Sequence, residues 1–329
     1  MKAFIKDIAV CYPSKILSND DLVKRGCKWT AKQIHSKIGV KSRHICSEDE
    51  SSLTLGLEAT RKLLTKNPEM ADRIDYILFS TLCHDHFMLN SAAYIQKALN
   101  LPENIASVDF KLGCSGYITL LTFAKALIES GIACNVLVIT ADTYSKVLDE
   151  YDFGTMTVFG DAATATLIST DGKYRIAKCS SGTDGTGSQI HAGRIGLYGI
   201  PDNEDPYGAK QKDSRNFYMI GEEIFDFVNS KISEFIKPFI GTEDFGIDDG
   251  TIYLFHQANQ YMLNYLRKKL MIPKDKFYMN MESTGNTSTS SIPIALNDIL
   301  NSSIPSKIIC CGFGGGYCWN GMILKNKHE

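Results

Sequence analysis

The chain has 329 residues, of which 44% are hydrophobic and 22% charged, and its formal net charge at pH 7 is −2. This composition is typical of a globular chain with one large domain or two closely packed halves. The small net charge argues against a dedicated nucleic-acid binder, and no stretch approaches the roughly 18 uninterrupted apolar residues of a membrane span. Ten cysteines are spread along the chain, and Met1–Asp7 lacks the apolar core of a signal peptide. We therefore expect a cytoplasmic protein with reduced cysteines and no membrane partner.

The first half of the chain shows apolar runs that alternate with helical patterns. We expect strands at 3–10, 76–81, 103–110, 135–140 and 162–168, and helices within 18–40, at 51–66, at 91–99 and directly after residue 114. The strands are continuous apolar runs rather than alternating ones. Such runs predict a largely parallel sheet with helices on both of its faces.

The second half repeats this order after a long loop at 182–216 that is rich in Gly, Asp and Pro. We expect strands at 174–181, 251–256, 307–311 and 317–324, and helices at 221–240, 259–270 and 289–300. The strand patterns that follow Gly160 and Gly316 are similar, which indicates an internal duplication. The predicted organisation is therefore an α/β fold with two related halves, residues 1–170 and 171–329.

Cys114 lies where an apolar run ends and a long helical pattern begins with Tyr117. Free N–H groups and the dipole at a helix N-terminus favour the thiolate, which is the nucleophilic form of cysteine. Gly113 and Gly116 on either side would keep bulky side chains away from the sulfur. The segment therefore indicates a nucleophile, although most free cysteines are inert residues of a core.

Two later segments carry polar residues that complement a nucleophilic cysteine. An apolar run at 251–255 ends at His256, and a polar loop carries Asn286 ahead of a helical pattern. Cys, His and Asn side chains from separate strand or loop ends are a set suited to acyl transfer through a thioester. The glycine run at 312–316 lets a backbone N–H approach a developing oxyanion, and Asn259 is predicted to order the loop after His256.

Five short motifs appear in the order and at the spacing of a known family. They are Gly113–Gly116, Phe159–Asp161, His256–Asn259, Gly285–Ser288 and Gly312–Gly316. On these motifs the chain resembles the β-ketoacyl-acyl carrier protein synthase III family of thiolase-like condensing enzymes, from its first strand to its C-terminus. The resemblance implies a thiolase fold, in which two similar halves are stacked in five αβαβα layers.

The resemblance also implies a decarboxylative Claisen condensation with Cys114, His256 and Asn286 as catalytic residues. Cys114 would take the acyl group from a thioester, and the backbone N–H groups of Cys114 and Gly315 would form the oxyanion hole. His256 and Asn286 would stabilise the enolate formed from malonyl-acyl carrier protein, which gives a 3-oxoacyl product of fatty acid biosynthesis. Phe159–Asp161 is expected to be a turn that holds the site. No cofactor or metal is expected, and the family's dimeric state predicts a homodimer.

Basic residues on the helix after His256 match the patch with which the family docks its acidic carrier protein. Lys268 and Lys269 match this patch, and Arg267 adds a third positive charge. The family's phenylalanine that closes the acyl pocket of the partner subunit aligns with Leu89 or with Phe87. This ambiguity leaves the acyl length open.

At the positions where the family's well-studied bacterial members bind coenzyme A, this chain has different residues. Gln33 and Lys37 stand where a tryptophan and an arginine are expected, and Trp29 is displaced by about one helical turn. Phe153 and Tyr261 replace two further arginines. Gln and Lys do not reproduce an aromatic plane and a guanidinium fork. The choice between a coenzyme A and a carrier-protein thioester as acyl donor therefore stays open.

Alternative functions are also open at this point. The acyl group on Cys114 could pass to an alcohol or an amine without loss of CO₂, in a specialised pathway. A catalytically silent scaffold subunit would keep the fold without the reaction. A thiolase proper would use a second cysteine near the final glycine run, but Cys318 follows that run, which fits a type III synthase better. His84, Asp85 and His86 resemble metal ligands, but ligands so close in sequence need distant partners to enclose an ion.

Overall fold

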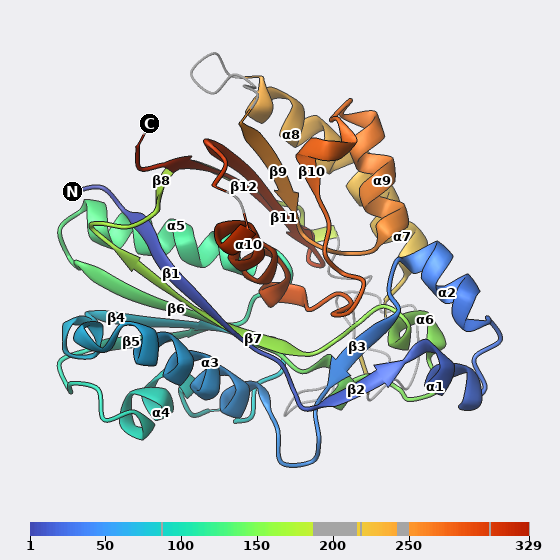
Figure 1. Cartoon of the computed structure of the whole chain (residues 1–329), viewed down its shortest axis with the longest axis horizontal. Coiled ribbons are helices and arrows are strands. Elements are labelled where there is room, and N and C mark those ends of the chain that lie inside the picture. The colour runs from blue at the N-terminus through green and yellow to red at the C-terminus, as the bar shows by residue number, and fades with distance from the viewer. Residues whose placement is uncertain (87, 187–215, 218, 242–249, 303, 329) are drawn as a thin grey trace.

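A computed structural model of the chain describes residues 1–86, 88–186, 216–217, 219–241, 250–302 and 304–328 (Figure 1). Most of the loop expected at 182–216 therefore lies outside the described residues, as does Phe87. None of the helices within the described ranges combines the length and the apolar character needed to cross a lipid bilayer.

One ten-stranded sheet, in the order β10-β9-β11-β12-β8-β1-β7-β6-β4-β5, organises the fold. Its strands are β1 (Phe4–Cys11), β4 (Tyr76–Ser80), β5 (Ala106–Phe110), β6 (Asn135–Asp142), β7 (Ala162–Ser169), β8 (Tyr174–Thr183), β9 (Thr251–Phe255), β10 (Phe277–Tyr278), β11 (Lys307–Gly314) and β12 (Cys318–Asn326).

The two halves of this sheet have the same strand order and the same directions. The order β5-β4-β6-β7-β1 in the first half recurs as β10-β9-β11-β12-β8 in the second half. In each half the first two neighbouring pairs are parallel and the last two are antiparallel. The halves meet through two residue pairs between β1 and β8, which are Phe4 with Arg175 and Ile5 with Tyr174.

The helices are arranged in layers around the strands (Figure 1). They are α1 (Asn19–Lys24), α2 (Ala31–Ile38), α3 (Ser52–Lys66), α4 (Ser91–Ala98), α5 (Gly116–Glu129), α6 (Phe153–Met156), α7 (Gly221–Phe227), α8 (Ser233–Ile240), α9 (Gln260–Lys269) and α10 (Ser291–Ser302). Helices α5 and α10 contact strands of both halves and form the middle layer.

Three apolar clusters separate these layers. The central cluster joins α5 and α10 to both halves of the sheet and includes Leu120 and Leu296. A second cluster, with Leu63 and Ile95, packs α3 and α4 on the first half. A third cluster packs α7, α8 and α9 on the second half. Burying both faces of each half explains why the strands are continuous apolar runs.

The structure differs from the prediction at several element ends. Strand β6 continues past Thr140, because Ala141 and Asp142 still pair with β7. The helix expected at 221–240 is divided into α7 and α8 by a π-helical turn at Val228–Ile232. A small antiparallel pair, β2 (Lys15–Ser18) with β3 (Ser42–Ile45), is absent from the prediction. Neither four-residue sequence alternates between apolar and polar residues, so no strand pattern marks them.

Candidate active site

Cys114 lies in the turn between β5 and α5, two residues before the helix begins at Gly116. A Cβ on Gly116 would approach Thr289 Cγ2 to 2.6 Å, and a Cβ on Gly314 would approach Cys114 Cβ to 2.9 Å. Both positions therefore need glycine because other segments pack closely against this turn. Asn320 Nδ2 donates to the Ser115 carbonyl at 2.8 Å and fixes the turn from β12.

The thiol of Cys114 does not ionise as easily as its place before a helix predicts. Burial raises the pKa of Cys114 to about 12, even though the Ser288 hydroxyl, with Oγ 3.7 Å from Sγ, acts to lower it. The nearby Asp142 carboxylate also raises this pKa. In the free protein, burial therefore opposes the thiolate that the helix dipole favours.

His256 directly follows β9, and its backbone N–H donates to the Cys311 carbonyl on β11 at 2.8 Å. The ring is buried and stands nearly perpendicular to Phe313, with the ring centroids 5.5 Å apart. Its Nδ1 lies 2.7 Å from Ser291 Oγ. Burial lowers the pKa of His256 to about 3, so the ring is neutral and carries one N–H.

Asn286 lies in a buried turn that is paired with the segment before β7. Its N–H donates to the Val158 carbonyl at 2.9 Å, and its carbonyl accepts the Gly160 N–H at 3.0 Å. The side-chain Oδ1 accepts the Ser288 N–H at 2.9 Å. This contact fixes the amide so that Nδ2 is the atom left to donate to a ligand. The pairing supports a structural role for the turn at 159–161.

The short segment 286–291 links the three predicted catalytic residues. It begins with Asn286, its Ser288 contacts the Cys114 sulfur, and its Ser291 contacts the His256 ring. The predicted nucleophile belongs to the first half of the chain, and the two predicted hydrogen-bond donors belong to the second half. One buried segment of six residues therefore brings them to the same place.

The end of β11 is a second link between the two halves. Phe313 packs against His256, and the next residue, Gly314, packs against Cys114. Gly315, the predicted oxyanion-hole donor, lies in the exposed turn after β11. Its role stays a prediction, whereas the close approach of Gly314 to Cys114 is observed.

Asp142, at the end of β6, is a fully buried carboxylate that the motifs did not reveal. Its Oδ1 accepts the Leu82 N–H at 2.8 Å, and its Oδ2 accepts the Thr289 N–H at 3.2 Å as well as the Thr289 hydroxyl. These bonds tie the turn after β4 to the segment 286–291. A single acid at the end of an apolar strand was the only signal in the sequence.

Asn259 and Asp85, two polar residues noted in the sequence, have structural roles. Asn259 Oδ1 accepts the Met262 N–H at 2.8 Å and caps α9, which orders the chain after His256. Asp85 Oδ2 accepts the Leu53 N–H at 2.8 Å near the start of α3. Within the part of the chain that the structure describes, no three His, Cys, Asp or Glu side chains are grouped to hold a metal ion.

Family models match both halves of the chain. Residues 108–185 match the model of 3-oxoacyl-[acyl-carrier-protein (ACP)] synthase III, and residues 242–326 match the model of its C-terminal part. A beta-ketoacyl-[acyl-carrier-protein] synthase III of Streptococcus agalactiae serotype III (strain NEM316) is 34% identical over 331 residues, which cover 98% of this chain and 99% of the relative. The chain belongs to the synthase III family.

Solved structures of synthase III share this fold. One crystal structure of a 3-oxoacyl-(acyl-carrier-protein) synthase III has a TM-score of 0.90 at 34% identity, and the match covers 99% of this chain and 100% of that chain. The synthase of Burkholderia xenovorans LB400 has a TM-score of 0.90 at 31% identity, with 99% and 94% covered. The predicted family, thiolase-like fold and acyltransferase class are confirmed.

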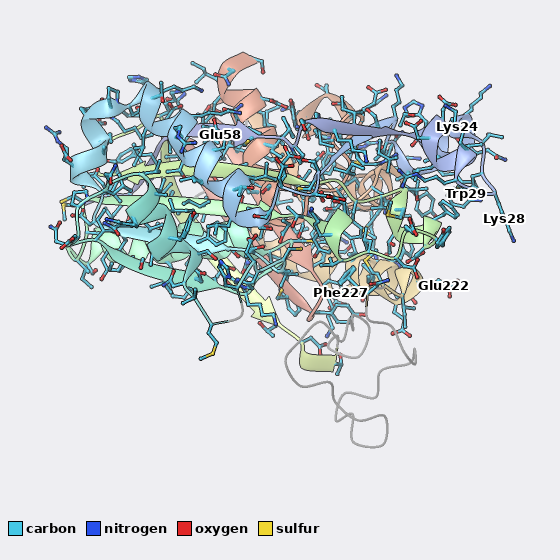
Figure 2. All side chains as sticks on the ribbon, turned by 90° about the horizontal axis from the view of Figure 1, so that it is seen from below. Lys24, Lys28, Trp29, Glu58, Glu222 and Phe227 are labelled. Carbon is cyan, nitrogen blue, oxygen red and sulfur yellow. The ribbon has the colours of Figure 1, made fainter. Side chains whose placement is uncertain are left out.

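Gln33 and Lys37 stand at two positions where residues that bind coenzyme A are expected. In this synthase III both side chains contact other residues of the chain. Gln33 Oε1 accepts the Thr30 N–H at 2.8 Å and completes the N-terminal cap of α2. Lys37 Nζ lies 4.5 Å from the centre of the Trp29 ring, within cation–π distance. Trp29 and Lys28 lie together at one end of the molecule (Figure 2).

The predicted docking residues lie in the last turn of α9. Lys268 and Lys269 are exposed, and Lys269 Nζ donates to the Asn229 carbonyl at 2.7 Å. Arg267 turns back, so that its Nη1 donates to the Ile272 carbonyl at 2.9 Å. Arg267 therefore holds the chain after α9, and the two lysines carry most of the exposed charge predicted for this patch.

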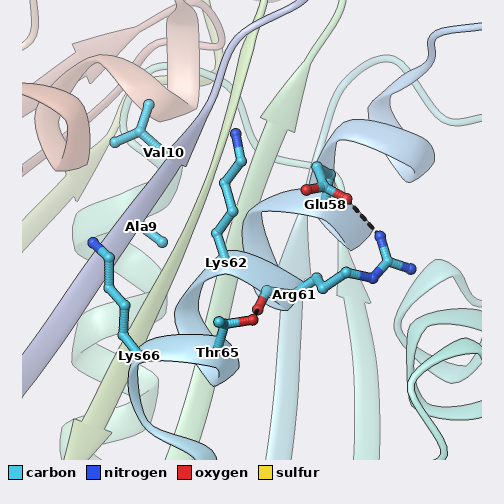
Figure 3. Close-up of a pocket in the computed structure, with 7 residues that line it drawn as sticks. All are labelled: Ala9, Val10, Glu58, Arg61, Lys62, Thr65 and Lys66. Carbon is cyan, nitrogen blue, oxygen red and sulfur yellow. Dashed lines mark hydrogen bonds and ion pairs between the residues drawn. The ribbon is translucent and has the colours of Figure 1, made fainter.

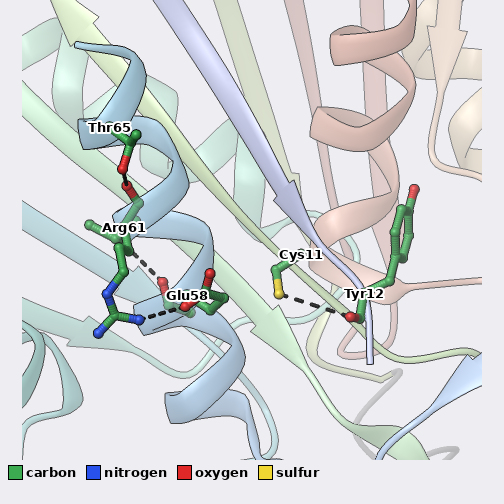
Figure 4. Close-up of polar contacts among 7 residues, drawn as sticks. Cys11, Tyr12, Glu58, Arg61 and Thr65 are labelled. Carbon is green, nitrogen blue, oxygen red and sulfur yellow. Dashed lines mark hydrogen bonds and ion pairs between the residues drawn. The ribbon is translucent and has the colours of Figure 1, made fainter. Parts of the chain in front are cut away.

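A hollow of about 330 Å³ lies beside α3, and Figure 3 shows its basic side chains. It is lined by Ala9, Val10, Glu58, Arg61, Lys62, Thr65 and Lys66. Arg61 is paired with Glu58 at 2.5 Å, and the Thr65 hydroxyl donates to the Arg61 carbonyl at 2.8 Å (Figure 4). None of the predicted catalytic residues lines this hollow, so it is separate from the candidate active site.

Proposed function

We propose that Cys114 carries the acyl group in this synthase III, and that His256 and Asn286 promote its condensation with a decarboxylated malonyl unit. The observation that best supports these roles is the segment 286–291, which contains Asn286 and contacts both other residues. A nucleophile and two hydrogen-bond donors held at one place are the groups that this reaction requires.

The first step transfers an acyl group from a thioester donor to Cys114. The sulfur bonds to the carbonyl carbon, the donor's C–S bond breaks, and the thiol proton ends on the leaving sulfur. Because the pKa of Cys114 is raised to about 12, we propose that the proton leaves only when the donor occupies the site. The backbone N–H groups of Cys114 and Gly315 would stabilise the oxyanion of the intermediate.

The second step uses malonyl-acyl carrier protein. Loss of CO₂ leaves its electron pair on the malonyl unit as an enolate, and His256 and Asn286 each donate a hydrogen bond to the enolate oxygen. The enolate carbon then attacks the acyl carbon on Cys114, whose sulfur leaves and takes up a proton. A neutral His256 suits this step, because an N–H donor is needed where negative charge develops.

We propose that the acyl donor is a carrier-protein thioester. Gln33 and Lys37 are engaged within the chain, and Phe153 and Tyr261 carry no positive charge for the phosphates of coenzyme A. An acidic carrier protein would instead meet the exposed Lys268 and Lys269 at the end of α9. Arg267 has a smaller part in this surface because it is bonded to the Ile272 carbonyl.

Intact-protein mass spectrometry tests the roles of Cys114 and of the donor together. The protein is incubated with matched panels of acyl-carrier proteins and acyl-coenzyme A esters. We expect an acyl adduct from the carrier-protein panel that is lost in Cys114→Ala and kept in Cys134→Ala, which removes an exposed cysteine. Adding malonyl-carrier protein should then remove the adduct and release CO₂. An adduct that persists in Cys114→Ala would contradict the mechanism.

We also propose a homodimer in which the β5 strands of two copies pair. Strand β5 is at the edge of the sheet, and Val108 on it is 40% exposed. Phe123 packs on Phe110 of this strand and is 48% exposed, and Leu89 is 68% exposed. An exposed apolar edge strand is a template for pairing with another strand.

Sedimentation velocity tests the dimer. Val108→Lys should shift the protein to monomer, because it places a charge on the proposed interface. Val23→Lys, at a similarly exposed valine on α1, should leave the dimer intact. A wild-type monomer, or a dimer unaffected by Val108→Lys, would contradict this interface.

Two further expectations stay proposals. The division into halves 1–170 and 171–329 is supported by the repeated strand order, since β7 ends at Ser169 and β8 begins at Tyr174. A cytoplasmic location is supported by the ten cysteines, all of which are free.

A further inference from the structure

We propose that Ser291 fixes the tautomer of His256, so that the ring carries its proton on Nε2. Ser291 is the first residue of α10, and its Oγ lies 2.7 Å from His256 Nδ1. Both side chains are buried, so water does not compete for this contact. Ser291 is a positioning residue, because it acts on substrate only through the ring of His256.

The protons around Ser291 Oγ can be assigned by counting donors and acceptors. A hydroxyl has one proton to donate and two lone pairs to accept with. The backbone N–H of Gln257 can only donate, and its nitrogen lies 3.4 Å from Ser291 Oγ. Among the described residues, the hydroxyl has hydrogen bonds only to Gln257 and His256. The single acceptor available for the hydroxyl proton is therefore His256 Nδ1.

This assignment decides which nitrogen of His256 carries the N–H. The ring is neutral because burial lowers the pKa of His256 to about 3, so it has one proton for two nitrogens. If Nδ1 accepts from Ser291, the proton is on Nε2. Phe313 packs against the ring and restricts its rotation. Nε2–H is then held as a donor, as the active site requires.

The consequence for catalysis rests on the proposed function of His256. An enolate oxygen needs a donor, and the other tautomer would present the lone pair of Nε2 to that oxygen. Removing the Ser291 hydroxyl lets both tautomers form. We expect the condensation step to slow about fivefold in Ser291→Ala, the change that one ordinary hydrogen bond corresponds to. Acylation of Cys114 does not use the His256 proton, so its rate should stay within twofold.

The test compares Ser291→Ala with Ser291→Thr, which keeps a hydroxyl, and with Ser302→Ala, which removes an exposed serine at the far end of the same helix. NMR of ¹⁵N-histidine-labelled protein reports the tautomer directly, and His256→Gln identifies the signals. We expect protonated Nε2 in the wild type, Ser291→Thr and Ser302→Ala, and a mixture of tautomers in Ser291→Ala. The rates of acylation and of malonyl-carrier protein consumption are measured on the same samples.

The outcomes separate this inference from the proposed function. A wild-type His256 with its proton on Nδ1 would overturn the inference even if Ser291→Ala failed to fold. An unchanged tautomer in Ser291→Ala would overturn it too, as would an equal loss of both rates. If His256→Gln left condensation unchanged, the proposed function of His256 would fail, while the tautomer assignment would stand on the NMR signals alone.

Discussion

The two halves of this synthase III repeat one topology but hold the active site in different ways. Helix α5 in the first half and α10 in the second half both lie in the middle layer and both begin at the site. Before α5, the chain presents Cys114 with glycines packed closely around it. At the start of α10, the segment 286–291 fixes its polar groups with hydrogen bonds.

This difference follows from the chemistry proposed for each half. A nucleophile must be reached by its acyl donor, and the glycines at 116 and 314 let neighbouring segments pack closely against its turn without an added side chain. Hydrogen-bond donors must keep one orientation, and buried partners such as Ser288 and Ser291 supply it. The repeated topology therefore gives two equivalent positions, and local packing differs between them.

The largest expected effect on the reaction rate comes from removing the two proposed hydrogen-bond donors of the second half, His256 and Asn286. His256→Ala and Asn286→Ala should each slow the condensation step about 100-fold to 1000-fold, because each removes one stabilising hydrogen bond from the enolate. Acylation of Cys114 should change only a few-fold. Stopped-flow acylation and CO₂ release measure the two steps separately. Equal losses of rate in acylation and condensation would contradict the proposal that the two halves have separate roles.

The buried His256 also predicts how stability changes with pH. Its pKa is lowered from 6.5 to about 3 on folding, so the unfolded chain binds more protons between these values. Stability should therefore fall as pH decreases below 6.5, and this residue alone should contribute about 2–3 kcal/mol of that loss at pH 4.5. Urea unfolding of the wild type and of His256→Gln at pH 7 and pH 4.5 should show a smaller loss in the variant. Equal losses would mean that His256 is not buried and neutral.

A smaller effect should follow from adding a Cβ beside the predicted nucleophile. A Cβ on Gly314 would lie 2.9 Å from Cys114 Cβ, so Gly314→Ala should slow acylation about tenfold through displacement of the sulfur. Gly221→Ala is the matched control, because a Cβ there would meet no atom within 4 Å. Mass spectrometry of the acyl adduct over time gives the acylation rates of the two variants, which are then compared. If both variants behaved like the wild type, close packing at Gly314 would not matter for the reaction.

The smallest effect concerns the reactivity of the free thiol. Because the buried Asp142 carboxylate raises the pKa of Cys114, Asp142→Asn should increase the rate of Cys114 alkylation by iodoacetamide a few-fold at pH 8. The same change should lower the free energy of unfolding, because the amide keeps one acceptor oxygen and its nitrogen cannot accept the second of the two N–H groups, those of Leu82 and Thr289. Slower alkylation in a folded variant would show that Asp142 does not act on the thiol.

Much of the candidate site could be proposed from the sequence because its predicted catalytic residues lie in short motifs. Cys114, His256 and Asn286 each stand beside glycine or at the end of an apolar run, where a pattern can reveal them. Asp142 and Ser291 could not be found in this way, since their importance comes from contacts between segments far apart in the chain. The effect of burial on the Cys114 thiol could not be predicted for a related reason: the helix start can be read locally, whereas burial of the sulfur depends on the whole fold.

Strand β1 has a consequence for how the chain folds during synthesis. It is made first, but its main partner β7 begins at Ala162, roughly 160 residues later. At a synthesis rate of 5–20 residues per second, β1 waits about 10 to 30 s on the ribosome before it can pair. During that time its apolar side chains have no sheet to pack on, so this early strand is open to non-native pairing until β7 has been made.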